Sequence, residues 1–183
     1  MQSNVFQWDE LTIIRQQAVK LFSRELSKAE KEQFCDWLEF VLCLVYGYGW
    51  QDAEEVVGAI PFQEGLDDKA VNLEINGLTF RDRLMGEEHT PDEVLRLIDT
   101  ESHRDYNTGV YDAAKASGLS GLRKQWLTMM DDRVRDTHSY LEGMIVGIDD
   151  RFYTYDGDSA MYPGGFALPQ NNVNCRCGIG LIR

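Results

Sequence analysis

One stretch decides the fold that we expect for this chain: TPDEVLRLIDTESHRDYNTGVYDAAKASG, residues 90–118. It begins with Thr90 as a helix cap and Pro91 at the first helical position, and carboxylates follow at the positive end of the helix dipole. Apolar residues recur at helical spacing on both sides of a polar run, residues 99–107, and Gly118 ends the pattern. The sequence predicts one long helix whose polar middle either faces water or joins a buried polar network.

Helical patterns also precede this helix. Apolar residues recur at helical spacing over residues 11–22, and residues 27–30 form a capping box that opens a second helix. Gly47 and Gly49 interrupt the second pattern, so we expect that helix to end there and a short one to follow at residues 52–57.

Short strands follow the long helix. We expect them at QWLTMM, residues 125–130, at MIVGI, residues 144–148, and at CRCGIGLI, residues 175–182. Residues 135–143 read as a short polar helix or turn, and a long loop precedes the last strand. The expected sheet is small and antiparallel.

The predicted fold class is therefore α+β, with helices first and the small antiparallel sheet at the C-terminus. We divide the chain into a helical region, residues 1–60, a linker with a short strand and turn, residues 61–90, and a core, residues 91–183. The core holds the long helix and the sheet.

Composition excludes several classes of partner. The chain has 183 residues, and 31 acidic against 18 basic side chains give a net charge of −13. Such a surface repels phosphate backbones and disfavours non-specific nucleic-acid binding. We also expect no sequence-specific nucleic-acid binding. The longest apolar run, residues 40–46, is too short to span a bilayer, so no membrane partner is expected.

The first polar cluster that could carry chemistry lies in the middle of the long helix: Thr100, Glu101, Arg104 and Asn107. Glu101 and Arg104 are three residues apart and share a helix face. They form either an ordinary surface ion pair, worth less than about 1 kcal/mol, or part of a buried network.

The second cluster, DDRVRDTH at residues 131–138, places three acids, two arginines and a histidine in one turn. Histidine beside carboxylates permits acid–base chemistry, and a nuclease-like or transferase-like enzyme would use His138, Arg135 and Glu101. No nucleophile motif, phosphate-binding loop or zinc-protease helix accompanies these residues. We therefore expect no catalytic residues, and a structural hydrogen-bond network instead.

The third cluster is the pair Cys175 and Cys177. Two residues apart in a strand, both thiols would point to one face, and a disulfide between them would be strained. Metal sites usually take four ligands, whereas His138, Cys175 and Cys177 supply three, and only His103 or an Asp at a distance is available as a further ligand. We expect no cofactor and two buried cysteines flanking Arg176, with zinc bound by these three side chains as the alternative.

The order and spacing of the clusters resemble the phage Mu F-like and SPP1-type minor head proteins, the phage head morphogenesis family. The residues that carry this resemblance are Trp126, Asp132, Arg133, Arg135, His138, Leu141, Gly143, Phe152, Pro163, Gly164, Asn174, Cys175, Arg176 and Cys177, preceded by Thr100, Glu101, Arg104 and Asn107. The resemblance covers residues 92–182, and residues 1–90 carry no motif of the family.

The resemblance implies a low-copy structural protein of the virion, inside the phage head or near the portal, assembled in the cytoplasm of the bacterial host. Its implied partners are the portal protein and other head proteins, and its implied role is head morphogenesis and DNA packaging or ejection. A phage-derived enzyme and a zinc-stabilised interaction module are the alternatives.

Within that family we expect one polar network to tie the long helix to the sheet. Its predicted members are Glu101, Arg104, Asn107, Asp132, Arg135, His138 and Arg176.

Overall fold

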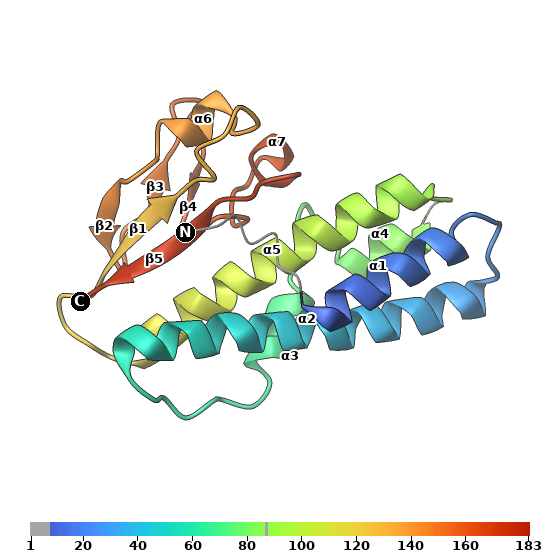
Figure 1. Ribbon diagram of the computed structural model, residues 1–183, viewed down its shortest axis with the longest axis horizontal. Coiled ribbons are helices and arrows are strands. Elements are labelled where there is room, and N and C mark those ends of the chain that lie inside the picture. The colour runs from blue at the N-terminus through green and yellow to red at the C-terminus, as the bar shows by residue number, and fades with distance from the viewer. Residues whose placement is uncertain (1–7, 87) are drawn as a thin grey trace.

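The computed structural model describes residues 8–86 and 88–183 and has the predicted α+β fold, with helices first and a small antiparallel sheet at the C-terminus (Figure 1). The helices are α1 Asp9–Leu21, α2 Lys28–Val57, α3 Leu66–Val71, α4 Phe80–Gly86, α5 Pro91–Ala116, α6 Asp136–Ser139 and α7 Pro169–Asn172. The strands are β1 Arg123–Leu127, β2 Ile145–Gly147, β3 Phe152–Tyr153, β4 Ser159–Ala160 and β5 Gly178–Ile182. None of the described helices has both the length and the apolar content needed to cross a bilayer.

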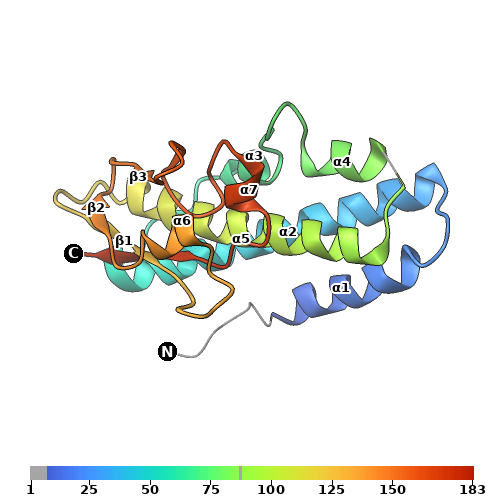
Figure 2. The same cartoon turned by 90° about the horizontal axis from the view of Figure 1, so that it is seen from above.

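Two long helices form the centre of the molecule. α2 and α5 lie side by side and run in the same direction, and α1 packs beside them in the opposite direction (Figures 1 and 2). Both long helices begin with capping boxes: α2 with the predicted pair of Ser27 and Glu30, and α5 with Thr90, the predicted cap, paired with Glu93. The two strongest start signals in the sequence therefore mark the two longest elements.

The expected end of α2 at Gly47 and Gly49 is wrong. α2 continues through both glycines to Val57, so residues 52–57 are its last turns and not a separate helix. Gly49 is buried where α2 crosses α5, and this packing outweighs the poor helix propensity of glycine.

The segment between the long helices contains α3 and α4. The turn at Asn76 and Gly77 is present, with an isolated bridge between Ile75 and Leu78, and α4 follows it. α3 was not predicted, since its pattern of six residues is too short to stand out from the sequence around it.

The sheet has the strand order β2-β1-β5, with both neighbours antiparallel to β1. It lies beside the C-terminal half of α5 (Figure 1). The strand expected at residues 125–130 begins earlier and ends at Leu127, and the last strand begins only at Gly178. Cys175 and Cys177 therefore precede the strand in which they were expected.

The segment expected to be a long loop also contains β3, β4 and α7. β3 and β4 form a two-stranded sheet, and the side chain of Phe152 in β3 is buried against Trp126 of β1. Phe166, which lies between β4 and α7, packs against Trp126 of β1 and His138 of α6.

Candidate functional site

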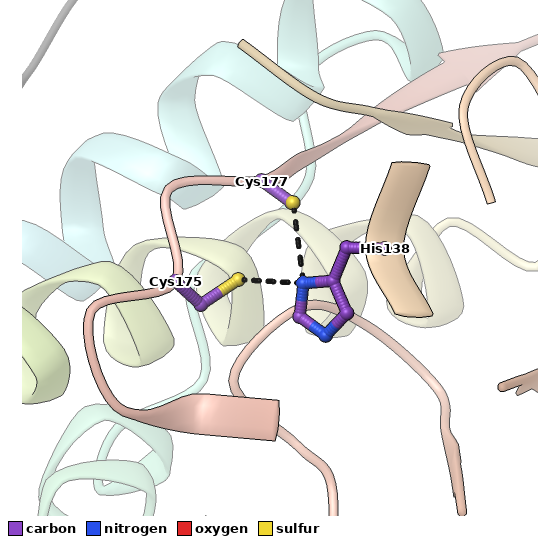
Figure 3. A group of neighbouring side chains, drawn as sticks. All are labelled: His138, Cys175 and Cys177. Atoms are coloured by element: carbon purple, nitrogen blue, oxygen red, sulfur yellow. Dashed lines mark hydrogen bonds between the residues drawn. The ribbon is translucent and has the colours of Figure 1, made fainter. Parts of the chain in front are cut away.

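His138, Cys175 and Cys177 form a buried group of three side chains (Figure 3). His138 comes from α6, and the two cysteines come from the turn between α7 and β5. Each Sγ lies 3.5 Å from Nδ1 of His138, and all three ligand atoms lie within 4.8 Å of one another. The fold thus brings together the three residues that the sequence offered as metal ligands.

Aromatic rings fix the histidine in this group. The His138 ring stacks on Phe166 at 5.3 Å and meets the edge of Trp126 at 5.4 Å between ring centroids. Its Nε2 is buried and has no hydrogen-bond partner among the described residues. The imidazole therefore reaches polar groups through Nδ1.

Main-chain hydrogen bonds hold the cysteine turn. The amide of Cys175 donates to the carbonyl of Asn172 at 3.0 Å. From α5, Asn107 Nδ2 donates to the carbonyl of Cys177 at 3.3 Å, and the amide of Ile179 donates to Asn107 Oδ1 at 3.1 Å. His103 Nε2 contacts the same Cys177 carbonyl. The polar middle of α5 thereby positions the cysteines.

The two thiols differ in acidity. Hydrogen bonds from Cys177, and then from His103 and His138, lower the pKa of Cys175 well below its usual value despite burial. The hydrogen bond with Cys175, together with burial, raises the pKa of Cys177. The thiolate is therefore favoured at Cys175 and disfavoured at Cys177.

A cavity of about 600 Å³ adjoins the Cys175 side of this group, and its lining includes His103, Arg135 and Arg176. Arg135 donates to the carbonyls of Gln170 and Val173. The guanidinium of Arg176 binds Asp131 through both terminal nitrogens, at 2.6 and 2.8 Å. The arginines that flank the cysteines therefore hold the surrounding loops together.

A second polar group is buried at the other side of α5. The Arg104 guanidinium lies 2.5 Å from Glu101 and 3.0 Å from Asp105, and it also donates to main-chain carbonyls of α3. Arg83 of α4 binds Glu101 at 2.9 Å. Burial raises the pKa of Asp105 to about 7, although Arg104 opposes this.

The seven residues predicted to form one polar network are distributed over several sets of contacts. Glu101 and Arg104 belong to the ionic group with Asp105, Asn107 holds the cysteine turn, and His138 joins the cysteines. Arg176 binds Asp131, and Asp132 is exposed.

His103 and Asp105 contribute to these sites, although the sequence analysis selected neither of them for the polar network. Both lie in the polar run at residues 99–107, and that run is the signal that could have identified them. A polar run that is buried needs a partner for each charged side chain.

The part of the chain that contains these sites also matches the model of a known protein family. The model of the family described as "Phage Mu protein F like protein" matches residues 63–179, more than half of the sequence. The chain belongs to the phage Mu protein F-like family. The resemblance expected from the sequence is confirmed, and the Mu F-like match extends beyond residues 92–182 toward the N-terminus to include α3 and α4.

Two curated relatives are similar to part of this chain. The minor head protein GP7 of Bacillus phage SPP1 is 31% identical over 81 residues, which are 44% of this chain and 26% of that protein. The NAD(+)–arginine ADP-ribosyltransferase EFV of Enterococcus faecalis (strain ATCC 700802 / V583) is 36% identical over 88 residues, 46% of this chain and 18% of that protein. The chain thus spans about a quarter or less of these relatives' lengths. No solved structure matches it.

Proposed function

We propose that this Mu F-like chain is a minor structural protein of a phage head that contacts the portal protein and other head proteins. The observation that carries the proposal is the family match over residues 63–179, which is supported by the similarity to a minor head protein. In this proposal the chain acts in head morphogenesis and in DNA packaging or ejection.

The charge of the chain supports a place beside packaged DNA. A net charge of −13 repels the phosphate backbone, so the protein would not bind the genome non-specifically. Proteins rather than nucleic acid are therefore the partners that this surface favours.

Exposed tyrosines offer a surface for such contacts. Tyr140, Tyr153 and Tyr155 are 59%, 63% and 65% exposed, and the rings of Tyr140 and Tyr155 lie 6.4 Å apart. Tyrosine is enriched in protein interfaces because it buries a large area and keeps a hydroxyl for hydrogen bonding. We name these three residues the tyrosine group and assign the head-protein contact to it.

A co-purification experiment tests the proposal. The tagged chain is co-expressed with the portal protein encoded by the same phage genome, and we expect the portal protein to be retained. Replacement of the tyrosine group by serine should reduce retention at least about tenfold, because residues at the centre of an interface carry most of the affinity. Phe40→Ser, at another exposed aromatic residue, is the control. Failure to retain the portal or any other head protein, and absence of the chain from purified virions, would contradict the proposal.

A structural role without catalysis is part of the same proposal. The side chains that an enzyme would use have separate structural contacts: His138 with the cysteines, Arg135 with loop carbonyls, and Glu101 with Arg104. We expect no turnover of NAD(+) or of nucleic acid by the purified chain. Turnover that is lost in His138→Ala but kept in a variant of exposed Asp132 would support the enzyme alternative instead.

A further inference from the structure

We infer that His138, Cys175 and Cys177 form a binding site for a single zinc ion, with Nδ1 and two thiolates as ligands. This inference does not depend on the proposed role in the phage head. It follows from the spacing, the burial and the chemistry of the three side chains.

The spacing matches tetrahedral zinc. An ion about 2.3 Å from sulfur and about 2.0–2.1 Å from nitrogen, at tetrahedral angles, places the two ligand atoms about 3.6 Å apart. Both Sγ–Nδ1 distances are 3.5 Å. The side chains therefore need only small movements to bind the ion.

Hydrogen bonding alone leaves the group incompletely satisfied. Nδ1 has a single hydrogen-bonding direction, either one lone pair or one proton, whereas two sulfurs lie at equal distance from it. An ion placed among the three atoms would interact with all of them. The proton of the imidazole would then lie on Nε2, and this leaves the Nδ1 lone pair for the metal.

Burial and charge select the kind of ion. The three residues are almost fully buried, which favours a site without net charge. Two thiols that lose their protons to solvent on binding would balance a divalent cation. Thiolate with imidazole is a ligand set that prefers zinc to magnesium or calcium.

The fourth coordination position has room next to the site. The adjoining cavity of about 600 Å³ is lined by both Cys175 and His103. The His103 ring also contacts the carbonyl of Cys177 through its Nε2. Water or the His103 imidazole is the fourth ligand that this arrangement offers, and the two choices give different results in a His103→Phe variant.

Metal analysis of the full chain tests the inference. Protein purified under reducing conditions and supplied with zinc should hold about one zinc per chain, and Cys175→Ser and Cys177→Ser should lose most of it. Cys43→Ser is the matched control, because Cys43 is a free cysteine of α2 and should leave the zinc content unchanged. His103→Phe should keep the zinc if water is the fourth ligand and weaken binding if His103 is.

A measurement on the unaltered chain covers the case in which the serine variants do not fold. Cobalt(II) replacing zinc should give the thiolate charge-transfer and intense visible bands of a tetrahedral sulfur-containing site, and a chelator should abolish them and lower the melting temperature. Zinc at less than about 0.1 per chain, with no cobalt spectrum, would overturn the inference. Zinc retained in both folded serine variants would overturn it as well.

Discussion

Gly49 of α2 and Gly109 of α5 lie at the same helix crossing, each against the main chain of the other helix. A Cβ atom added to Gly49 would lie 2.1 Å from the carbonyl oxygen of Tyr106, and one added to Gly109 would lie 2.1 Å from that of Tyr46. The two longest helices therefore approach closely because both lack a side chain at the point of contact.

Gly49→Ala and Gly109→Ala should each destabilise the fold. The added methyl group must push the helices apart, and overpacking of this kind costs about 1–3 kcal/mol or more. Gly47→Ala is the matched control, because no atom lies within 4 Å of its added Cβ and alanine is the better helix former by about 1 kcal/mol. Chemical denaturation of the three variants tests this, and equal stability of Gly47→Ala and Gly49→Ala would contradict it.

Arg104→Met should unfold the chain much more readily than a change at a surface ion pair. Removal of the guanidinium leaves Asp105 buried without its cation and Glu101 with Arg83 alone, and the loss of one partner of a buried pair costs about 3–5 kcal/mol. Arg15→Met, at the partly exposed pair with Asp99, should cost less than about 1 kcal/mol. Chemical denaturation measures the free energy of unfolding of both variants. A loss in Arg104→Met no larger than that in Arg15→Met would show that the buried ionic group does not stabilise the fold.

Asn107→Ala should destabilise the attachment of the cysteine turn to α5. Asn107 donates to the carbonyl of Cys177 and accepts from the amide of Ile179, and it is fully buried. The substitution leaves the buried amide of Ile179 unpaired, which costs about 1–3 kcal/mol, while the Cys177 carbonyl keeps its contact with His103. Asn72→Ala removes an amide that donates to Glu39 in a partly exposed position, and it should cost less. Urea denaturation measures the free energy of unfolding of both variants. An equal loss of stability would show that the hydrogen bonds of Asn107 to the cysteine turn do not stabilise the fold more than the Asn72 contact does.

Local signals in the sequence were sufficient for the long helices and the order of the core. Thr90, Pro91 and Glu93 specify the start of α5 within four residues, so no tertiary contact is needed to predict it. The order and spacing of the family motifs can likewise be read from the sequence, so the family could be predicted without the structure. These features are encoded over short distances in the chain.

Features that depend on distant contacts could not be predicted. The passage of α2 through Gly49 depends on Tyr106, and the burial of Arg104 depends on carbonyls of α3 more than thirty residues away. The sequence left open whether the polar run of α5 faces water, because only the positions of Arg83 and α3 decide it. The meeting of His138 with Cys175 likewise requires the sheet to be formed.

Lys124 of β1 provides a test by pH. Its side chain is fully buried, its Nζ donates to the carbonyl of Ile148 at 2.9 Å, and it lies 4.8 Å from the centre of the Tyr111 ring. Burial lowers the pKa of Lys124 from 10.5 to about 8, while Asp149 and Asp150 oppose this change. The folded protein therefore gives up this proton more readily than the unfolded chain does.

The sign of the effect follows from linkage. Between pH 8 and 10.5 the unfolded chain holds the proton that the folded chain has lost, so the contribution of Lys124 to stability rises with pH in this window. Below pH 8 both states hold the proton, and the cost of the buried charge is fully present. The free energy of unfolding of the unaltered chain, minus that of Lys124→Met, should rise with pH between pH 8 and 10.5. Lys115→Met is the control, because the hydrogen bond with Asp149 raises the pKa of Lys115 and the rise should be kept. Parallel pH profiles for the unaltered chain and Lys124→Met would mean that the buried amine is not the group that titrates.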